Sequence, residues 1–389
     1  MTVKDEVLDN HLEHIINFRR RLHKEPELSF KEFQTTNLIE NGLEDTNIKF
    51  YDLNEKTGLI GVLEKDPSYD YIGMRADMDA LPITEMTDLD FKSENEGVMH
   101  ACGHDIHTSI MYGFAKVIND MHDELKYNIV FIFQPAEEVL GGAKYIKEEL
   151  KRLEIPVDKM IMFHTWPTLE EGLIGYREED MMAGSTGFNV KLTAKGGHAA
   201  HPDTTADPIY LASNIIQFIQ GIASRFNDPA TPVVITVGQI DAGEKNNVIP
   251  GECHFGGTIR SFSEKSIDMA KDMIEEYTKE LTEMSGAGYE IEYSKYCPPV
   301  INNQELVEDF INCGDTSVFH ELSEPSMGSE DFAFYMQDYV GAAFRIGTKM
   351  KDVEESGYSL HSPEVVFSEK SIETAINALV SFATEKKKA

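Results

Sequence analysis

One largely apolar segment, residues 127–133 with the sequence Tyr-Asn-Ile-Val-Phe-Ile-Phe, constrains the fold more than any other feature of this chain. Successive side chains of a strand point to opposite faces of a sheet, so a strand that is apolar throughout is buried on both faces. Similar patterns predict further strands near 57–64, 70–75 and 159–163, and helices near 5–23, 107–122 and 142–152. The sequence therefore predicts an α/β domain with a mixed sheet flanked by helices.

A different pattern occupies residues 183–296. It predicts strands near 186–194, 232–240, 252–260 and 288–294, and helices near 207–225 and 263–284. This order is that of a ferredoxin-like α+β domain. Helices near 303–312 and 368–386 and a strand near 341–346 then return the chain to the first domain. At 389 residues the chain exceeds what one core usually serves, so we expect a domain formed by 1–182 and 297–389, interrupted by 183–296.

The charge and the cysteine content exclude several classes of protein. A formal net charge of -33 repels phosphate backbones and anionic lipids, so neither nucleic acid nor membrane is an expected partner. The first ten residues lack the pattern of a signal peptide, and no apolar run reaches transmembrane length. The four cysteines form no Cys-x-x-Cys pair. These features predict a cytoplasmic protein.

The segment Cys102-Gly103-His104-Asp105 places a thiol and an imidazole two residues apart around a glycine. Sulfur and nitrogen donors at this spacing, with a nearby carboxylate to orient the imidazole, suit a transition-metal ion. The triplet alone is a weak signal and favours a packed cysteine beside a surface histidine. A metal site therefore requires further donors.

Two adjacent acids, Glu137 and Glu138, follow the apolar segment 127–133. Carboxylates at the end of a buried strand are costly unless they face ions or water in a cleft. On an extended backbone their side chains diverge, so one can hold a metal ion while the other reaches a water molecule. A solvated turn is the alternative interpretation.

Two histidines complete the candidate set. His164 ends the predicted strand 159–163, and His361 lies in a loop before the last predicted helix. Either histidine alone could be structural. Together with Cys102, His104 and Glu138 they provide five donors, enough for two metal ions if one donor bridges or water completes each shell.

A series of motifs then points to a known family. In chain order they are RRLH at 20–23, PEL at 26–28, RADMDALP at 75–82, MHACGHD at 99–105, QPAEE at 134–138, GGHAA at 196–200, NVIP at 247–250, GTIR at 257–260, GSEDF at 328–332 and LH at 360–361. Over nearly its whole length the sequence resembles the dinuclear metallo-aminoacylase and carboxypeptidase family. Within that family it resembles the bacterial and plant amidohydrolases, which include hippurate hydrolases and auxin-conjugate hydrolases.

The resemblance implies two divalent ions per subunit and a set of protein ligands, namely Cys102, His104, Glu138, His164 and His361, with the Cys102 sulfur bridging. It also implies that Glu137 is the general base, which takes a proton from water and delivers it to the departing amine. Thiolate and imidazole ligands favour zinc, whereas members of this branch are associated with manganese or cobalt.

Three residues of the insert receive roles from the same resemblance. His198 stabilises the carbonyl oxygen of the substrate in the active site of a partner subunit, which makes the protein a homodimer or a higher homo-oligomer. Asn247 and Arg260 hold the carboxylate of the substrate's amino-acid half. Without the family, the preferred interpretation of His198 is a residue that merely follows a Gly-Gly turn, and that of Arg260 is an ordinary surface arginine. The resemblance also implies that the insert acts as a lid and dimerisation domain, with hinges near residues 183 and 296.

The predicted activity is metal-dependent hydrolysis of the amide bond of N-acyl amino acids. A dipeptidase, a non-catalytic metal-binding protein and a thiol enzyme that uses Cys102 as its nucleophile are the alternatives. Asp77 and Asp79 either orient ligands or belong to a structural turn. Trp166, the only tryptophan, is either a wall of the acyl pocket or a packing residue.

Overall fold

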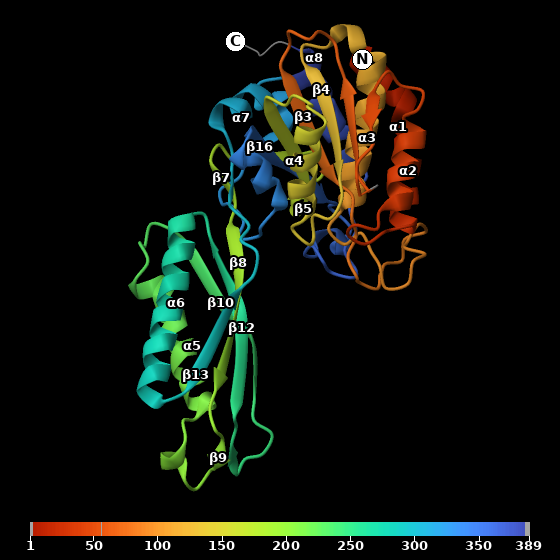
Figure 1. The fold of residues 1–389 in the computed structure, drawn as a ribbon. Helices are drawn as coiled ribbons and strands as arrows, with labels where there is room; N and C mark the ends of the chain where they lie inside the picture. Colours follow the sequence, from red (N-terminus) through yellow and green to blue (C-terminus); the bar gives the residue numbers. More distant parts are fainter. Residues whose placement is uncertain (1–2, 56, 386–389) are drawn as a thin grey trace. The chain divides into compact units, whose positions relative to one another are not determined.

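The computed structural model describes residues 3–55 and 57–385 and divides the described chain into two compact units (Figure 1). Unit 1 comprises Met1–Met181, Ile301–Glu324 and Asp331–Ala389, and unit 2 comprises Met182–Val300 and Pro325–Glu330. The sequence assigned segment 325–330 to the first domain, but it joins unit 2 because it hydrogen-bonds there. Ser326 accepts a hydrogen bond from the Ala183 backbone, for example.

Unit 1 is built on a mixed sheet with strand order β1-β2-β4-β3-β5-β16-β6-β15. The central strands β4, β3, β5 and β16 run parallel, and antiparallel neighbours flank them on both sides. The strands span Lys49–Tyr51 (β1), Leu59–Leu63 (β2), Tyr71–Asp77 (β3), Asn128–Gln134 (β4), Lys159–Glu170 (β5), Ile174–Tyr176 (β6), Phe319–Glu321 (β15) and Val340–Lys349 (β16). Every residue of β4 is buried, as its apolar sequence predicted.

The helices of unit 1 bury a large apolar core against this sheet. The α-helices span Val3–Lys24 (α1), Phe33–Gly42 (α2), His104–Asp120 (α3), Gly142–Arg152 (α4), Gln304–Ile311 (α7) and Lys370–Thr384 (α8), with 3-10 turns at His122–Glu124, Thr316–Val318, Asp331–Gln337 and Glu354–Gly357. Helices α1, α3 and α8 pack together closely. A β-carbon on Gly113 of α3 would lie 2.5 Å from Ile376 of α8 and 2.7 Å from Ile15 of α1. Only glycine permits this approach.

Unit 2 is an antiparallel sheet with strand order β10-β12-β8-β13 and two helices that share an apolar core with it. Its elements span Gly184–Thr193 (β8), Pro208–Arg225 (α5), Val233–Ala242 (β10), Glu252–Ser261 (β12), Glu264–Ser285 (α6) and Gly288–Tyr293 (β13). Asp207 caps α5 by accepting hydrogen bonds from Ile209 and Tyr210, and Ser263 caps α6 in the same way from Ser266. This order of elements confirms the predicted ferredoxin-like domain.

Small elements complete the description. Unit 2 has a two-stranded ribbon of β9 (Gly197–His198) and β11 (Val248–Ile249), and a 3-10 turn at Pro202–Thr204. β7 (Asp180–Met182) and β14 (Val300–Ile301) pair with each other. None of the helices in the described ranges is both long enough and apolar enough to cross a bilayer.

Two local predictions are wrong. His164 does not end its strand, because β16 continues to pair with β5 as far as Trp166 and again at Glu170. Pro167, which cannot donate a hydrogen bond, lies where this register is interrupted. Glu137 and Glu138 do not continue an extended backbone, since they begin a turn after Ala136, whose φ of 56° is left-handed.

Candidate metal centre

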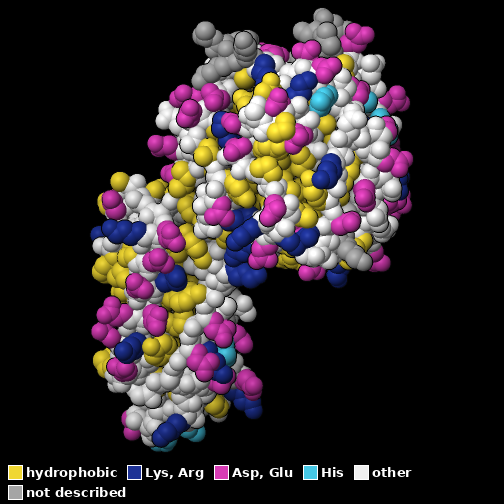
Figure 2. All heavy atoms as spheres, turned by 45° about the horizontal axis from the view of Figure 1, so that its top comes forward, with side chains coloured by type: hydrophobic (Ala, Val, Ile, Leu, Met, Phe, Trp, Pro, Cys, Tyr) yellow, Lys and Arg dark blue, Asp and Glu magenta, His cyan; other side chains and the backbone are white. Residues whose placement is uncertain are grey.

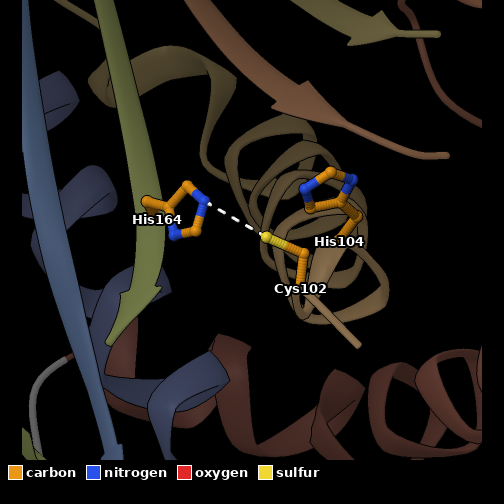
Figure 3. Close-up of side chains that lie close together, drawn as sticks. All are labelled: Cys102, His104 and His164. Atoms are coloured by element: carbon orange, nitrogen blue, oxygen red, sulfur yellow. Dashed lines mark hydrogen bonds between the residues drawn. The ribbon is translucent and has the colours of Figure 1, made fainter. Parts of the chain in front are cut away.

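Cys102, His104 and His164 converge in unit 1, and their donor atoms all lie within 4.8 Å of one another. The Cys102 sulfur points toward His164, with His104 beside it (Figure 3), and lies 3.6 Å from His164 Nε2. Gly103 makes the turn between the first two residues possible. Its φ is +83°, and a β-carbon there would lie 2.6 Å from Thr165 Oγ1. The absence of a β-carbon at Gly103 therefore allows the loop to pack closely against the strand that carries His164.

Glu138 and His361 approach the same sulfur from other segments. Cys102, Glu138 and His361 form a second group of donors within 4.8 Å of one another, and His361 Nε2 lies 3.5 Å from Glu138 Oε1. The backbone of His361 donates to Ala101 at 2.9 Å and has a left-handed φ of 68°. Such strain in a non-glycine residue persists only where surrounding contacts hold it. Cys102 thus belongs to both groups of donors.

Two buried atoms of this cluster have no hydrogen-bond partner among the described residues. They are His104 Nε2 and Glu138 Oε1, which lie 3.9 Å apart. Buried polar atoms are otherwise almost always paired, because an unpaired one loses its interaction with water. One thiol, three imidazoles and a carboxylate are donors that transition metals accept. The donor types present would therefore suit divalent transition-metal ions held by these residues.

In His104 and His164, hydrogen bonds made by Nδ1 determine which ring nitrogen can bind a metal ion. His104 Nδ1 lies 2.8 Å from the Asp79 carbonyl oxygen, and His164 Nδ1 lies 2.8 Å from the Thr165 carbonyl oxygen. Carbonyl oxygens only accept, so both Nδ1 atoms carry hydrogen, and in each ring Nε2 is the nitrogen that remains for a metal ion. Asp105, which follows His104, does not orient it; its carboxylate instead contacts His23 at 2.8 Å.

Glu137 is 6% exposed and lies beside Glu138 and His104. The Asp79 carboxylate accepts hydrogen bonds from the backbones of Glu137 and Glu138, each at 3.1 Å, in addition to contacting His104. Asp79 thus positions two candidate ligands and the candidate base. Sequence reasoning left this residue undecided between an orienting and a structural role.

The buried carboxyl group of Glu32 stabilises the turn that carries Glu137 and Glu138. Glu32 Oε1 accepts a hydrogen bond from the Ala136 backbone at 2.9 Å, directly before Glu137. Burial, with a smaller contribution from Asp79, raises the pKa of Glu32 to about 8. Sequence reasoning gave Glu32 no role, because it lies between the predicted helix near 5–23 and the predicted strand near 57–64, where no element was assigned.

A second buried network lies beneath Glu137. Arg75 contacts Asp77 at 2.6 Å and Asp331 at 2.8 Å, and all three side chains are fully buried. The Asp331 backbone donates to Glu137 Oε1 at 3.4 Å. His107 bridges Asp77 and the backbone of Thr165, next to His164. The motifs at 75–82 and 328–332 pointed to this network, although sequence reasoning assigned neither Arg75 nor Asp331 a role.

Burial favours the protonated forms of two candidate ligands, Glu138 and Cys102. Burial, together with Asp79 and Asp77, raises the pKa of Glu138 to about 7 against the opposing effect of His104. Burial also raises the pKa of the Cys102 thiol and lowers the pKa of His164. A cation that binds these groups must displace the protons of the acids, so metal affinity is expected to rise with pH.

Unit 2 separates the three residues that the resemblance assigned to it. His198 and Asn247 lie together, because β9 pairs with β11 and the Ala199 backbone donates to Asn247 at 3.1 Å. Both are exposed. Arg260 lies near the other end of β12, where it donates to the Met327 carbonyl at 2.8 Å. The strand between Glu252 and Arg260 spans about 27 Å. Within a single copy of unit 2, Arg260 and Asn247 are therefore too far apart to contact the same small group.

A mixed α/β domain that carries this cluster of thiol, imidazole and carboxylate donors beside a buried glutamate defines a metal-dependent hydrolase. The model of the peptidase family M20/M25/M40 matches residues 73–385, and the chain belongs to that family.

Characterised relatives cover most of the chain. An IAA-amino acid hydrolase ILR1-like 4 of Arabidopsis thaliana is 36% identical and covers 95% of this chain and 85% of its own length. An N-acetylcysteine deacetylase of Bacillus subtilis is 36% identical, with 86% of each chain covered. A solved Bacillus subtilis structure, described as a dinuclear metal binding peptidase from the M20 family, has a TM-score of 0.83 at 31% identity, over 97% of this chain and 98% of that one.

Proposed function

We propose that the protein hydrolyses the amide bond that joins an acyl group to an amino acid. The observation that carries this proposal is the position of Glu137. Its buried carboxylate lies among the donor atoms of His104 and Glu138, within 4.8 Å, although its neighbours in sequence form an ordinary turn. A carboxylate so close to a metal centre can reach a water molecule held there.

The proposed ligands of two divalent ions are Cys102, His104, Glu138, His164 and His361. Ions bound there would polarise the scissile carbonyl and lower the pKa of water, which makes it a nucleophile at neutral pH. Manganese, zinc and cobalt all suit this donor set. The Nδ1 hydrogen bonds of His104 and His164 hold their rings in the orientation that this binding requires.

Glu137 performs the proton transfers in this proposal. It takes a proton from the attacking water and delivers it to the amide nitrogen as the carbon–nitrogen bond breaks. The backbone of Asp331 donates to one carboxylate oxygen, and Asp79 fixes the Glu137 backbone. These contacts keep the carboxylate aimed at one place through both transfers.

The developing charge on the carbonyl oxygen requires a donor, and we assign it to His198 of a second copy of the chain. The Ala200 backbone donates to His198 Nδ1 at 3.1 Å, so the ring hydrogen is on Nε2, which is free to donate. His198 is exposed and lies with Asn247 at the end of unit 2 opposite Arg260. We therefore propose a homodimer in which the substrate carboxylate meets Arg260 and Asn247 from different copies.

The proposed compartment is the reducing cytoplasm. The cysteines Cys102, Cys253, Cys297 and Cys313 are all buried, and none of them forms a disulfide. A metal site that depends on the Cys102 sulfur requires that this thiol escape oxidation, and a reducing compartment provides that protection.

The test is hydrolysis by chelated protein that is resupplied separately with manganese, zinc or cobalt. The substrates are N-acetyl amino acids and, beside them, unmodified dipeptides. Activity on N-acetyl amino acids should return with metal and be lost in Glu137→Gln. Glu148→Gln, on the exposed face of α4, serves as the matched control. Cleavage of dipeptides alone would replace this proposal with a dipeptidase, and silence on both substrate classes would refute it.

A further inference from the structure

Arg345 lies one strand away from His164. β16 pairs with β5 in parallel, so that Arg345 lies opposite His164 and Gly347 lies opposite Trp166. Residues paired in this way point to the same face of a sheet, with backbones about 5 Å apart. His164 directs its imidazole toward Cys102 on that face. Arg345 therefore enters the region beside the candidate metal centre.

Trp166 connects the arginine to the centre. The guanidinium carbon of Arg345 lies 3.8 Å from the centroid of the Trp166 ring, and this ring lies 6.3 Å from that of His164. Stacking of this kind holds a guanidinium flat and leaves its edges free to donate hydrogen bonds. The positive charge of Arg345 is thus separated from the proposed ions by the side chains of Trp166 and His164.

This charge has no acidic partner among the residues that the structure describes. Arg345 is only 4% exposed; it donates to the Met181 carbonyl at 3.1 Å, and its Nε atom is buried without a partner. Burial and the nearby Arg177 lower its pKa to about 10. A buried charge without a counter-ion is costly, so proteins normally supply one.

The missing partner is notable in this chain. Asp and Glu number 68 against 35 Lys and Arg, and acidic side chains are scattered over the visible face in Figure 2. Other buried arginines of unit 1 do have acidic partners. Arg75 contacts Asp77 and Asp331, and Arg19 contacts Asp105. The lack of an acidic partner is therefore specific to Arg345 among these buried arginines. It points to an anion that a ligand supplies.

We propose that Arg345, held by Trp166, forms a subsite for a carboxylate that the substrate carries away from the scissile amide. The inference rests on the proposed amidohydrolase function and narrows its substrates to N-acyl amino acids with a second acidic group. An arginine fork donates two parallel hydrogen bonds to a planar carboxylate. The acyl group can carry that carboxylate, as in succinyl, or the amino-acid side chain can, as in glutamate.

Arg177 provides a matched control. Its Nε donates to the Asp180 carbonyl at 2.8 Å and its Nη1 to the Leu322 carbonyl at 2.7 Å, so these two nitrogens already have partners within the fold. Arg345→Gln and Arg177→Gln remove the same charge from the same region. A purely structural role for Arg345 would lower thermal stability and affect all substrates alike. A subsite instead changes the preference between an acid and its neutral isostere.

The kinetic test uses two isosteric pairs with the metal-loaded enzyme. One pair is N-succinyl-alanine and its succinamoyl analogue, and the other is N-acetyl-glutamate and N-acetyl-glutamine. The wild type should prefer the acid in one pair by about ten- to a hundredfold in kcat/KM, and that pair identifies which half carries the carboxylate. Arg345→Gln should bring the ratio to about one, and Arg177→Gln should keep it. No preference in either pair, or an equal loss in both variants, would overturn the subsite.

A binding test separates the subsite from the activity. Trp166 is the only tryptophan, so its fluorescence reports directly on ligands at Arg345. Chelated protein is titrated with the same four compounds at constant ionic strength. The preferred acid should change the fluorescence saturably, and Arg345→Gln should bind it at least about tenfold more weakly. This result in a protein without amidohydrolase activity would refute only the proposed function. Identical curves for the wild type and Arg345→Gln would refute the subsite.

Discussion

The two units hold their candidate residues in opposite ways. In unit 1, Glu137, His104 and Asp79 are buried. Asp79 alone contacts His104, Glu137 and Glu138. In unit 2, His198 and Asn247 are exposed and lie far along the sheet from Arg260. The difference teaches that one chain brings together the donor groups of the candidate metal centre, whereas the residues proposed to hold and polarise the substrate lie far apart within one copy.

Cys102→Ser tests the unit 1 half of this comparison and carries the largest expected effect. Loss of the sulfur that both donor groups share should release the metals and lower kcat/KM at least about a thousandfold. Metal content by mass spectrometry and the rate are measured together. Cys313→Ser, at another buried cysteine of unit 1, should keep both. A metal-loaded, active Cys102→Ser protein would mean that other residues form the centre.

His198→Ala tests the unit 2 half. Loss of this donor should lower kcat by about a hundred- to a thousandfold while metal content stays unchanged. Mixing His198→Ala with Glu137→Gln then gives a sharper readout. Hybrid dimers have one site with both residues intact, so activity should return on mixing and rise with the time allowed for subunit exchange. If exchange occurs and activity does not return, His198 acts in its own chain or has no catalytic role.

Asp79→Asn probes how strongly unit 1 depends on preorganisation. An amide accepts the Glu137 and Glu138 hydrogen bonds less well and contacts His104 without charge, so metal affinity should fall about ten- to a hundredfold. Competition with a chelator measures this loss. Asp88→Asn, on the exposed surface of the same unit, should match the wild type. Equal metal affinity in both variants would show that the ligands need no such support.

Glu32→Gln carries the smallest expected effect, and it depends on pH. The pKa of Glu32 is raised from 4.5 to about 8 in the folded protein, so its contribution to stability is full below pH 4.5 and is lost as the pH rises through about 8. The variant has no such dependence. Its melting temperature relative to the wild type should therefore rise by a few degrees between pH 5 and pH 9. A difference that does not change with pH would show that Glu32 is ionised throughout.

Much of the fold and of the centre could be predicted from sequence because their signals are local. The apolar segment 127–133 marks a central strand, and the order of elements in 183–296 defines the second domain. The contacts that support the centre could not be predicted, because they join distant positions. Asp79 and Glu138 are 59 residues apart, and Gln134 and Asp331 are 197 apart.

Strand register accounts for the other contacts that could not be predicted from the sequence. Arg345 is unremarkable as a residue of a predicted strand near 341–346. Only the pairing of β16 with β5 places it beside His164 and Trp166. The separation of Arg260 from Asn247 likewise follows from the length of β12 and from its pairing. Sequence motifs indicate which residues matter, whereas register decides which of them can act together.

The most direct test of the central claim is a titration of metal into chelated wild-type protein and Glu137→Gln, with bound metal and hydrolysis of an N-acyl amino acid measured on the same samples. The wild-type rate should rise with occupancy and level off at two ions per chain. Glu137→Gln should take up the same two ions and remain about a thousandfold slower. Full activity without metal, or a Glu137→Gln rate close to that of the wild type, would contradict the assignment of this centre and its base.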